Sequence, residues 1–247
     1  MDPVGFLENR VGPRPRALVV LNGPIADFGT LIKAWDVCDI KVFADGGANR
    51  VYDFLIAESS RSGQKFNVSN FLPDYITGDF DSLRDDVKQY YEQKGVKIVH
   101  DPDQYSTDFM KAVKLIENSK PVEYEILAFG SVGGRVDQEF HSIHFLYLAF
   151  ERKQTVILVS EESITFLLDK GTTTIKTPQS ILGDTCGIIP VGVEAVISTK
   201  GLRWDVSDWP TKFGGQMSTS NQLVSDVIEI TTNEKVVFTV ELRATGV

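Results

Sequence analysis

Short apolar runs alternate with helix-length amphipathic segments over residues 17–160. The runs are rich in Val, Ile and other apolar residues, and the segments between them carry apolar residues at helical spacing. This alternation is typical of βα units built around a mainly parallel sheet. The predicted strands are Ala17 to Leu21, Lys41 to Ala44, Tyr75 to Thr77, Val96 to His100, Glu125 to Phe129 and Thr155 to Ser160.

Helices are expected between these strands, and three can be given bounds. They are Leu83 to Lys94, about Asp108 to Asn118 and about Asp137 to Arg152. Ser82 can cap the first of them, and Asp85 at its third position completes a capping box. Gly95 is expected to end that helix. The polar stretch 58–70 has the composition of a surface loop.

The pattern changes after residue 160. No helix is predicted from residue 163 onward, where runs rich in Thr, Val and Ile are separated by Gly, Pro, Asn and Asp. Short strands at this spacing are typical of a sandwich or barrel. The predicted strands are Ile164 to Leu168, Thr172 to Lys176, Thr185 to Ile189, Ala195 to Thr199, Val227 to Thr231 and Val236 to Leu242.

We therefore expect two domains: an α/β domain over 17–160, with a mainly parallel sheet and flanking helices, and an all-β sandwich over 161–247. The first sixteen residues contain three prolines and no continuous apolar stretch, so they are expected to form a frayed N-terminus rather than a secretory signal. No apolar run approaches the roughly 18 residues that a membrane span needs.

Composition narrows the range of partners. The net charge is -9, from 34 acidic and 25 basic residues. This charge argues against nonspecific nucleic-acid binding, because clustered Lys and Arg side chains bind the phosphate backbone. A phosphate ligand would need a cation as intermediary. The two cysteines, Cys38 and Cys186, are far apart and in no metal-like spacing. Free thiols indicate a reducing compartment, so a cytoplasmic location is expected.

Two carboxylates one residue apart, Asp79 and Asp81, follow the predicted strand Tyr75 to Thr77. The carboxyl ends of parallel strands share one edge of the sheet, where ligands bind. Carboxylates at this separation repel each other, and a divalent cation removes the conflict. Asp108 begins a helix at the same edge and is a candidate third ligand. These three acids suit the binding of Mg²⁺ together with a nucleotide. The alternative interpretation is that they only cap the helices that follow them.

No P-loop and no G-x-G-x-x-G motif occurs in the chain. Two glycine segments at strand ends remain for phosphate binding, residues 45–50 and 130–135, each ending in an arginine. Glycines that only form tight βα turns are the alternative. His141 and His144 lie at helical spacing but lack a third metal ligand, and neither cysteine has a neighbouring base to make it a nucleophile.

Taken together and in order, these motifs resemble thiamine pyrophosphokinases of the eukaryotic type. The resemblance covers nearly the whole chain and rests on Asp45 to Arg50, Gly78 to Ser82, Pro102 to Gln104 with Thr107 and Asp108, Gly133 to Arg135 with Asp137 and Gln138, Gly187 to Gly192, Gly201 to Trp204 and Ser218 to Asn221. It departs at Gly130, Ser131 and Val132, where the family more often has a second glycine and a Leu.

The resemblance implies an N-terminal α/β domain, a C-terminal β-sandwich and a homodimer with its active clefts between subunits. It implies transfer of a diphosphoryl group from ATP to thiamine, giving thiamine diphosphate and AMP. The implied Mg²⁺ ligands and catalytic residues are Asp79, Asp81 and Asp108. The implied nucleotide-binding residues are Asp45, Asn49, Arg50, Arg135 and Asp137. The implied thiamine-binding residues are Gln104 and Thr107, with Trp204, Ser218 and Asn221 from the partner subunit.

Two other functions fit the same acidic motif. A nucleotide-sugar transferase would use the same metal chemistry on another donor and release UDP or GDP. A nucleotide-binding regulatory module would sense a ligand without catalysing a reaction. The number of acids beyond those needed for binding argues against the regulatory module.

Overall fold

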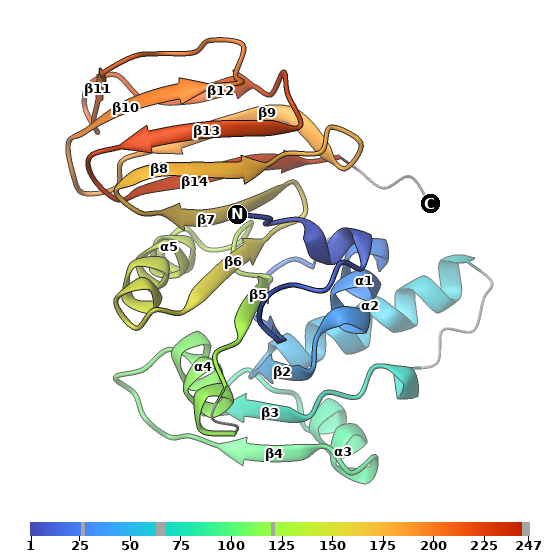
Figure 1. Ribbon diagram of the computed structural model, residues 1–247. Coiled ribbons are helices and arrows are strands. Elements are labelled where there is room, and N and C mark those ends of the chain that lie inside the picture. Colours follow the sequence, from blue (N-terminus) through green and yellow to red (C-terminus); the bar gives the residue numbers. More distant parts are fainter. Residues whose placement is uncertain (26–27, 63–67, 120–121, 244–247) are drawn as a thin grey trace. The chain divides into compact units, whose positions relative to one another are not determined.

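The computed structural model of the protein describes residues 1–25, 28–62, 68–119 and 122–243. The chain divides into two compact units (Figure 1). The α/β unit is Gly12–Glu161, and the β unit is Met1–Val11 together with Glu162–Val247. The β unit thus takes in residues at both ends of the chain.

Six parallel strands form the sheet of the α/β unit, in the order β6-β5-β1-β2-β3-β4. Their bounds are β1 (Arg16–Val20), β2 (Ile40–Ala44), β3 (Tyr75–Gly78), β4 (Lys97–His100), β5 (Glu125–Phe129) and β6 (Thr155–Val159). Strands β1 and β5 are almost wholly buried, as expected for parallel strands covered on both faces, whereas the edge strand β4 is more exposed. The parallel sheet predicted from the sequence is confirmed.

Within the described residues, five α-helices flank this sheet. They are α1 (Phe28–Val37), α2 (Gly47–Ser62), α3 (Asp85–Gln93), α4 (Asp108–Ser119) and α5 (Val136–Glu151). Helices α2 and α4 both pack on β1 and β2, from opposite sides of the sheet (Figure 1). The chain adds β2, β3 and β4 in one direction and then returns to place β5 beside β1. Right-handed crossovers therefore put α4 on the other face, and β1 and β5 form a topological switch point.

The β unit contains two antiparallel sheets, in the orders β12-β9-β14-β7 and β11-β10-β13-β8. Their bounds are β7 (Ser163–Leu168), β8 (Gly171–Lys176), β9 (Leu182–Ile189), β10 (Ala195–Lys200), β11 (Trp209–Thr211), β12 (Ser218–Gln222), β13 (Val227–Thr232) and β14 (Val236–Leu242). Phe166 and Phe238 are fully buried, with ring centroids 5.5 Å apart. Alternating burial along β13 is the pattern of one face packed on a core, as predicted for a sandwich.

The N-terminal residues form part of the β unit, so the predicted fraying is wrong. Residues Gly5–Glu8 form a 3-10 helix, η1, and Val4, Phe6 and Leu7 are buried. The backbone N–H of Lys176 donates to the Met1 carbonyl at 3.0 Å. Burial of three apolar side chains outweighs the prolines on which the prediction rested.

Several elements differ from the sequence pattern. Helix α2 continues to Ser62, and a second 3-10 helix, η2 (Val68–Asn70), follows, so the loop predicted over 58–70 is wrong at both ends; residues 63–67 lie outside the described part. Val51 and Leu55 are buried along α2, and this packing overrides the polar composition. Strands β11 and β12 were not predicted, because β11 has only three residues and contains a proline, and β12 is polar.

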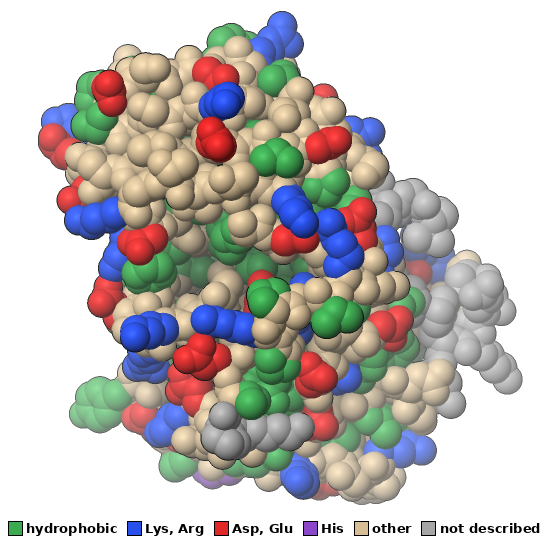
Figure 2. Space-filling model, viewed as in Figure 1, with side chains coloured by type: hydrophobic (Ala, Val, Ile, Leu, Met, Phe, Trp, Pro, Cys, Tyr) green, Lys and Arg blue, Asp and Glu red, His purple; other side chains and the backbone are tan. Residues whose placement is uncertain are grey.

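Charged side chains of both signs are interspersed on the face shown in Figure 2. Lys and Arg lie among Asp and Glu rather than in one continuous basic area. In the described part of the chain, every helix is too short or too polar to cross a lipid bilayer.

Candidate active site

A cleft of about 640 Å³ lies at the carboxyl ends of the strands of the α/β unit. Its lining comes from the segments that follow β1, β2, β3 and β5 and from the first turns of α4 and α5. Strands β1 and β5 are neighbours whose chains continue to opposite faces of the sheet. The cleft therefore lies at the topological switch point, where open α/β sheets bind their ligands.

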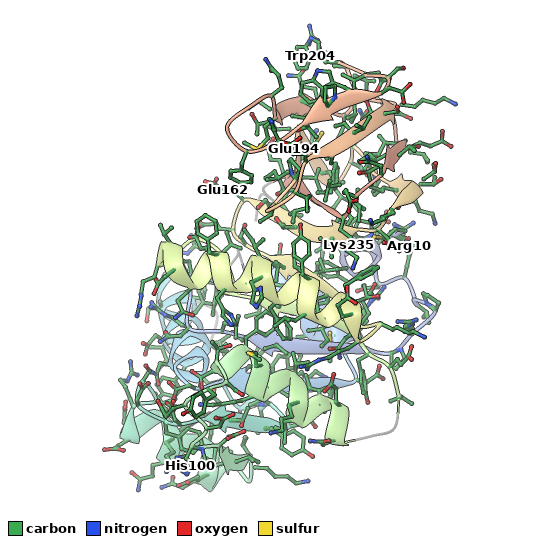
Figure 3. All side chains as sticks on the ribbon, turned by 90° about the vertical axis from the view of Figure 1, so that its left-hand side faces the viewer. Arg10, His100, Glu162, Glu194, Trp204 and Lys235 are labelled. Atoms are coloured by element: carbon green, nitrogen blue, oxygen red, sulfur yellow. The ribbon has the colours of Figure 1, made fainter. Side chains whose placement is uncertain are left out.

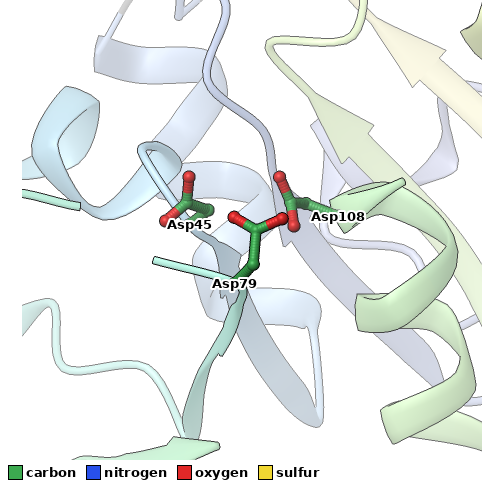
Figure 4. Close-up of side chains that lie close together, drawn as sticks. All are labelled: Asp45, Asp79 and Asp108. Carbon is green, nitrogen blue, oxygen red and sulfur yellow. The ribbon is translucent and has the colours of Figure 1, made fainter. Parts of the chain in front are cut away.

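Three carboxylates converge on this cleft. Asp45 follows β2, Asp79 follows β3 and Asp108 begins α4, so each comes from a different βα unit (Figure 4). One carboxylate oxygen from each residue lies within 4.8 Å of the other two. An all-oxygen set with this charge suits a hard divalent cation such as Mg²⁺. These three residues, which come from separate βα units, therefore fit a metal site.

Asp45 connects the turn after β2 to the turn after β3 by hydrogen bonds. Its two carboxylate oxygens accept hydrogen bonds from the backbone N–H groups of Ser82 and Leu83, each at 3.1 Å. Asp45 holds a φ of 46°, a left-handed conformation that is uncommon outside glycine. The residue thus belongs to the carboxylate cluster and also fixes the loop that carries Asp79.

The predicted capping box at α3 is wrong. The helix begins at Asp85, and its N-cap is Arg84, whose side chain makes no capping hydrogen bond. Ser82 instead donates its hydroxyl to Asp81 Oδ1 at 2.9 Å, while its backbone N–H bonds to Asp45. A contact with a distant strand end has taken the place of the local cap.

A glycine at position 78 permits the carboxylates to approach. A Cβ there would lie 2.7 Å from the Asp45 Cβ and 3.1 Å from Asp108 Oδ1. Its φ of 153° is also rarely adopted by residues with a side chain. Any larger residue would push Asp45 away from Asp108.

The carboxylates perturb one another's ionisation. Burial, followed by the charge of Asp108, raises the pKa of Asp45 to about 6. Burial also raises the pKa of Asp108, against the opposing charge of Lys111. For Asp79, burial favours a higher pKa, but hydrogen bonds from Lys111 and its other partners outweigh it, and the pKa is lowered. This charge crowding is what a bound cation would relieve.

Lys111 is a site residue that the sequence patterns missed. Its ammonium lies 3.1 Å from Asp79 Oδ2 and 3.3 Å from Asp108 Oδ1, and its side chain is 1% exposed. Burial works to lower the pKa of Lys111, but the two carboxylates outweigh it and raise the pKa. The available signal was a lysine three residues after Asp108, on the face of α4 that buries Phe109 and Ala112.

Asp81, Gln104 and Thr107 lie close to the cluster without belonging to it. Asp81 lines the same cleft, and its backbone N–H donates to Asp79 Oδ1 at 3.3 Å. Gln104 Nε2 donates to Asp79 Oδ2 at 3.2 Å. Thr107 Oγ1 accepts from the Met110 N–H at 3.4 Å, at the start of α4, and lines the cleft.

Asn49 and Arg50 support the cleft from α2. The Asn49 side chain donates to the Ser82 carbonyl at 2.7 Å and accepts from the Arg84 N–H at 3.1 Å, so its amide is engaged in holding the acidic loop. Arg50 lines the cleft and donates from Nε to Asn22 Oδ1 at 3.0 Å.

Arg135 and Asp137 pair with each other at the start of α5. The guanidinium contacts the carboxylate through two hydrogen bonds of 3.1 and 2.6 Å, and both residues are exposed. The hydrogen bonds between the two side chains lower the pKa of Asp137 and raise the pKa of Arg135. Arg135 also lines the cleft.

Trp204, Ser218 and Asn221 lie in the β unit. Trp204 is at the outer surface of that unit with 54% of its surface exposed (Figure 3). Asn221 is buried, and its side-chain amide accepts from the Trp204 N–H at 3.2 Å and donates to the Trp204 carbonyl at 3.0 Å. Asn221 therefore holds the backbone that presents Trp204.

Comparison with known proteins relates both units to one family. The model of the thiamin pyrophosphokinase catalytic domain matches residues 31–159, and that of the thiamin pyrophosphokinase vitamin B1 binding domain matches residues 172–237. This chain belongs to the thiamine pyrophosphokinase family. The resemblance found in the sequence motifs is therefore confirmed.

Similar thiamine pyrophosphokinases come from plants and fungi. Thiamine pyrophosphokinase 1 of Oryza sativa subsp. japonica is 37% identical over 234 residues, covering 92% of this chain and 87% of the rice protein. Thiamine pyrophosphokinase of Saccharomyces cerevisiae is 33% identical over 261 residues, covering 85% of this chain and 80% of the yeast protein.

Solved thiamine pyrophosphokinase structures share the fold. The Candida albicans protein has a TM-score of 0.86 at 30% identity, covering 98% of this chain and 92% of that one. The Bacillus subtilis protein has a TM-score of 0.70 at 16% identity, covering 93% of this chain and 100% of that one, which is a likeness of fold. The match extends through both units.

Proposed function

We propose that this chain forms thiamine diphosphate from thiamine and ATP by moving the β,γ-diphosphoryl group as one piece and releasing AMP. Membership of the thiamine pyrophosphokinase family makes it a transferase of this kind. The observation that carries the site assignment is the convergence of Asp45, Asp79 and Asp108 within 4.8 Å on a cleft at the switch point of the sheet.

We assign Mg²⁺ to these three carboxylates, which would hold it; Asp81 lines the same cleft. When bound, the cation would supply positive charge to the phosphate oxygens of ATP. Asp45 and Gly78 hold the carboxylates in place before substrate arrives, as described above. Lys111 balances part of their charge from the buried side of the cluster.

On the nucleotide side, Arg50 and Arg135 are the cations that line the cleft. The hydroxyl oxygen of thiamine bonds to the β-phosphorus of ATP and loses its proton to solvent. The bond from that phosphorus to the α–β bridging oxygen breaks, and AMP leaves with the oxygen. Negative charge then shifts toward the leaving group and the transferred oxygens. The arginines stabilise that charge by position, which is the main contribution a protein makes to phosphoryl transfer.

On the thiamine side, we place Gln104 and Thr107 from one subunit and Trp204 and Ser218 from the β unit of the partner subunit. Asn221 acts by fixing Trp204 rather than by touching thiamine, since its amide is occupied by the Trp204 backbone. We further propose a homodimer whose partner subunit supplies Trp204, and a cytoplasmic location, supported by the two buried free cysteines.

Incubation with Mg-ATP and thiamine, followed by separation of the products, tests the function. We expect AMP and thiamine diphosphate in equal amounts. ADP with thiamine monophosphate would instead indicate transfer of a single phosphoryl group. Unchanged ATP would favour a nucleotide sensor or a nucleotide-sugar transferase.

Mg²⁺ binding is expected to weaken as the pH falls. The pKa of Asp45 is raised to about 6, so below that pH the carboxyl holds a proton that the cation must displace, and above it the carboxylate is ionised. Calorimetric titration at about pH 7.5 and about pH 5 should show roughly tenfold weaker binding at the lower pH. Equal affinities at the two pH values would contradict a role for Asp45 as a ligand.

Trp204→Ala is expected to raise the KM for thiamine about tenfold and to leave the KM for ATP within about twofold, because an aromatic stacking surface for a flat ring is lost. Steady-state kinetics with each substrate varied in turn measures both constants. Phe213→Ala is the matched control, since Phe213 is equally exposed in the same unit. A Trp204 variant with an unchanged KM for thiamine would remove this residue from the substrate site.

A further inference from the structure

The segment between β5 and α5, residues 130–135, forms one wall of the cleft through Gly130, Ser131, Gly134 and Arg135. Gly133 holds a φ of 99°, in a region that glycine enters without steric conflict. The N-cap of α5 is Arg135, and its side chain makes no capping hydrogen bond. The Arg135 side chain therefore does not connect residues 130–135 to the first turn of α5.

Glu139 provides that attachment from the first turns of α5. Its Oε1 accepts hydrogen bonds from the backbone N–H groups of Gly133 and Gly134, both at 2.9 Å. Hydrogen bonds to an ionised carboxylate are stronger than those between neutral groups. The helix that carries Glu139 is itself anchored by the buried residues Phe145 and Leu146. The position of the glycine pair is thus tied to a rigid element.

We propose that Glu139 is a positioning residue for the nucleotide, which acts by holding the Gly133–Gly134 backbone in the shape that ATP binds. The proposal rests on the proposed function, because it assigns ATP to this cleft. Arg135, which follows the glycine pair directly, is one of the two arginines assigned to the phosphates. If Gly133 and Gly134 were not held by hydrogen bonds, the backbone of Arg135 would have no fixed position.

The same contact also fixes the position of the Glu139 carboxylate. The residue lines the cleft, where a free carboxylate would repel the phosphates of ATP. With Oε1 engaged by two amides, the carboxylate is directed at the glycine backbone. Losing the contact would let two glycines sample many conformations, and ATP binding would have to order them again.

The test compares Glu139→Ala and Glu139→Gln with Glu117→Ala, an exposed helical glutamate on α4 that serves as the matched control. Calorimetric titration with Mg-ATP should give a Kd about tenfold higher for Glu139→Ala, equivalent to about 1.4 kcal/mol. The Gln variant should stay within about threefold of the wild type, because one amide oxygen can still accept both N–H groups. The control should match the wild type.

Two further readouts separate positioning from general destabilisation. Amide hydrogen exchange at Gly133 and Gly134 should be faster in Glu139→Ala, with the thermal midpoint close to that of the wild type. In steady-state kinetics, the KM for ATP should rise while the KM for thiamine and kcat stay within about twofold.

An unchanged Kd in Glu139→Ala would overturn the proposal. A lower Kd would overturn it as well, because it would mean that Glu139 competes with the phosphates for the two amides. If the wild type binds Mg-ATP but makes no thiamine diphosphate, the proposed function fails while the Kd comparison still decides the role of Glu139. A wild type that does not bind Mg-ATP would overturn both.

Discussion

Asp79→Asn is expected to lower kcat about a thousandfold, because a neutral amide binds a divalent cation more weakly than a carboxylate, and that cation would supply the positive charge that the transferred phosphates require. Asp79 belongs to the carboxylate cluster, and its Oδ2 also contacts Lys111 and Gln104. Assays of thiamine diphosphate formation at saturating Mg-ATP and thiamine measure the loss. The affinity for Mg²⁺ should fall in parallel.

The fold should survive this substitution. The lowered pKa of Asp79 means that its ionised form stabilises the folded state above its usual pKa, and that this contribution disappears as the pH falls through the lowered value. Loss of the charge also relieves repulsion with Asp108, so the free energy of unfolding should change by no more than about 1 kcal/mol. Asp85→Asn, an exposed acid in the first turn of α3, is the control. Near-normal turnover in Asp79→Asn would contradict the metal assignment.

Lys111→Met is expected to destabilise the Mg²⁺-free protein by about 2 kcal/mol, because removal of a buried cation leaves two carboxylates facing each other without compensation. The partial exposure of Asp79 and Asp108 keeps the loss below that of a fully buried pair. Mg²⁺ should restore most of this stability, since it supplies positive charge to the same two carboxylates. Urea unfolding with and without Mg²⁺ measures both effects.

Lys114→Met is the matched control for this experiment, since Lys114 is exposed on the same helix. It should unfold like the wild type in both conditions. The Lys111 variant should also bind Mg²⁺ more tightly than the wild type, because a neighbouring positive charge has been removed. A loss of stability that is the same with and without Mg²⁺ would show that Lys111 and the cation do not share their partners.

The acidic loop was predictable from the sequence because the signal is local. Asp79 follows an apolar strand directly, and parallel strands bring their carboxyl ends to one edge of a sheet. That rule also brought Asp45 and Asp108 to the same edge. It could not decide which acids converge. Asp45, with its left-handed backbone, joins Asp79 and Asp108, whereas the Asp81 carboxylate accepts a hydrogen bond from the Ser82 hydroxyl and lies outside this group of three.

Residues whose role comes from packing were not predictable. Lys111 lies on the buried face of α4, and the sequence pattern alone does not explain a lysine at a buried position. Its reason is the pair of carboxylates that the tertiary fold places within reach. The prediction of a frayed N-terminus was wrong for the same reason: Val4 and Phe6 are buried, and the Met1 carbonyl accepts a hydrogen bond from Lys176, more than 150 residues away in sequence.

Asn221 illustrates a third limit. The family resemblance implied a contact with thiamine; the structure shows its amide bonded to the backbone of Trp204, from which we propose a supporting role. Strand β12, which carries Asn221, is irregular in its pairing with β9 between Ser218 and Asn221. Such an irregularity depends on the neighbouring strand, so the residues of β12 alone do not reveal it.

Crystals of the protein grown or soaked with Mn²⁺ in place of Mg²⁺, and with ATP present, allow the most direct measurement. Anomalous scattering locates Mn²⁺ independently of the protein density. We predict a peak enclosed by the carboxylates of Asp45, Asp79 and Asp108, and its loss in Asp79→Asn. A cation bound only to the phosphates or to other side chains, with these three carboxylates uncoordinated, would contradict the account.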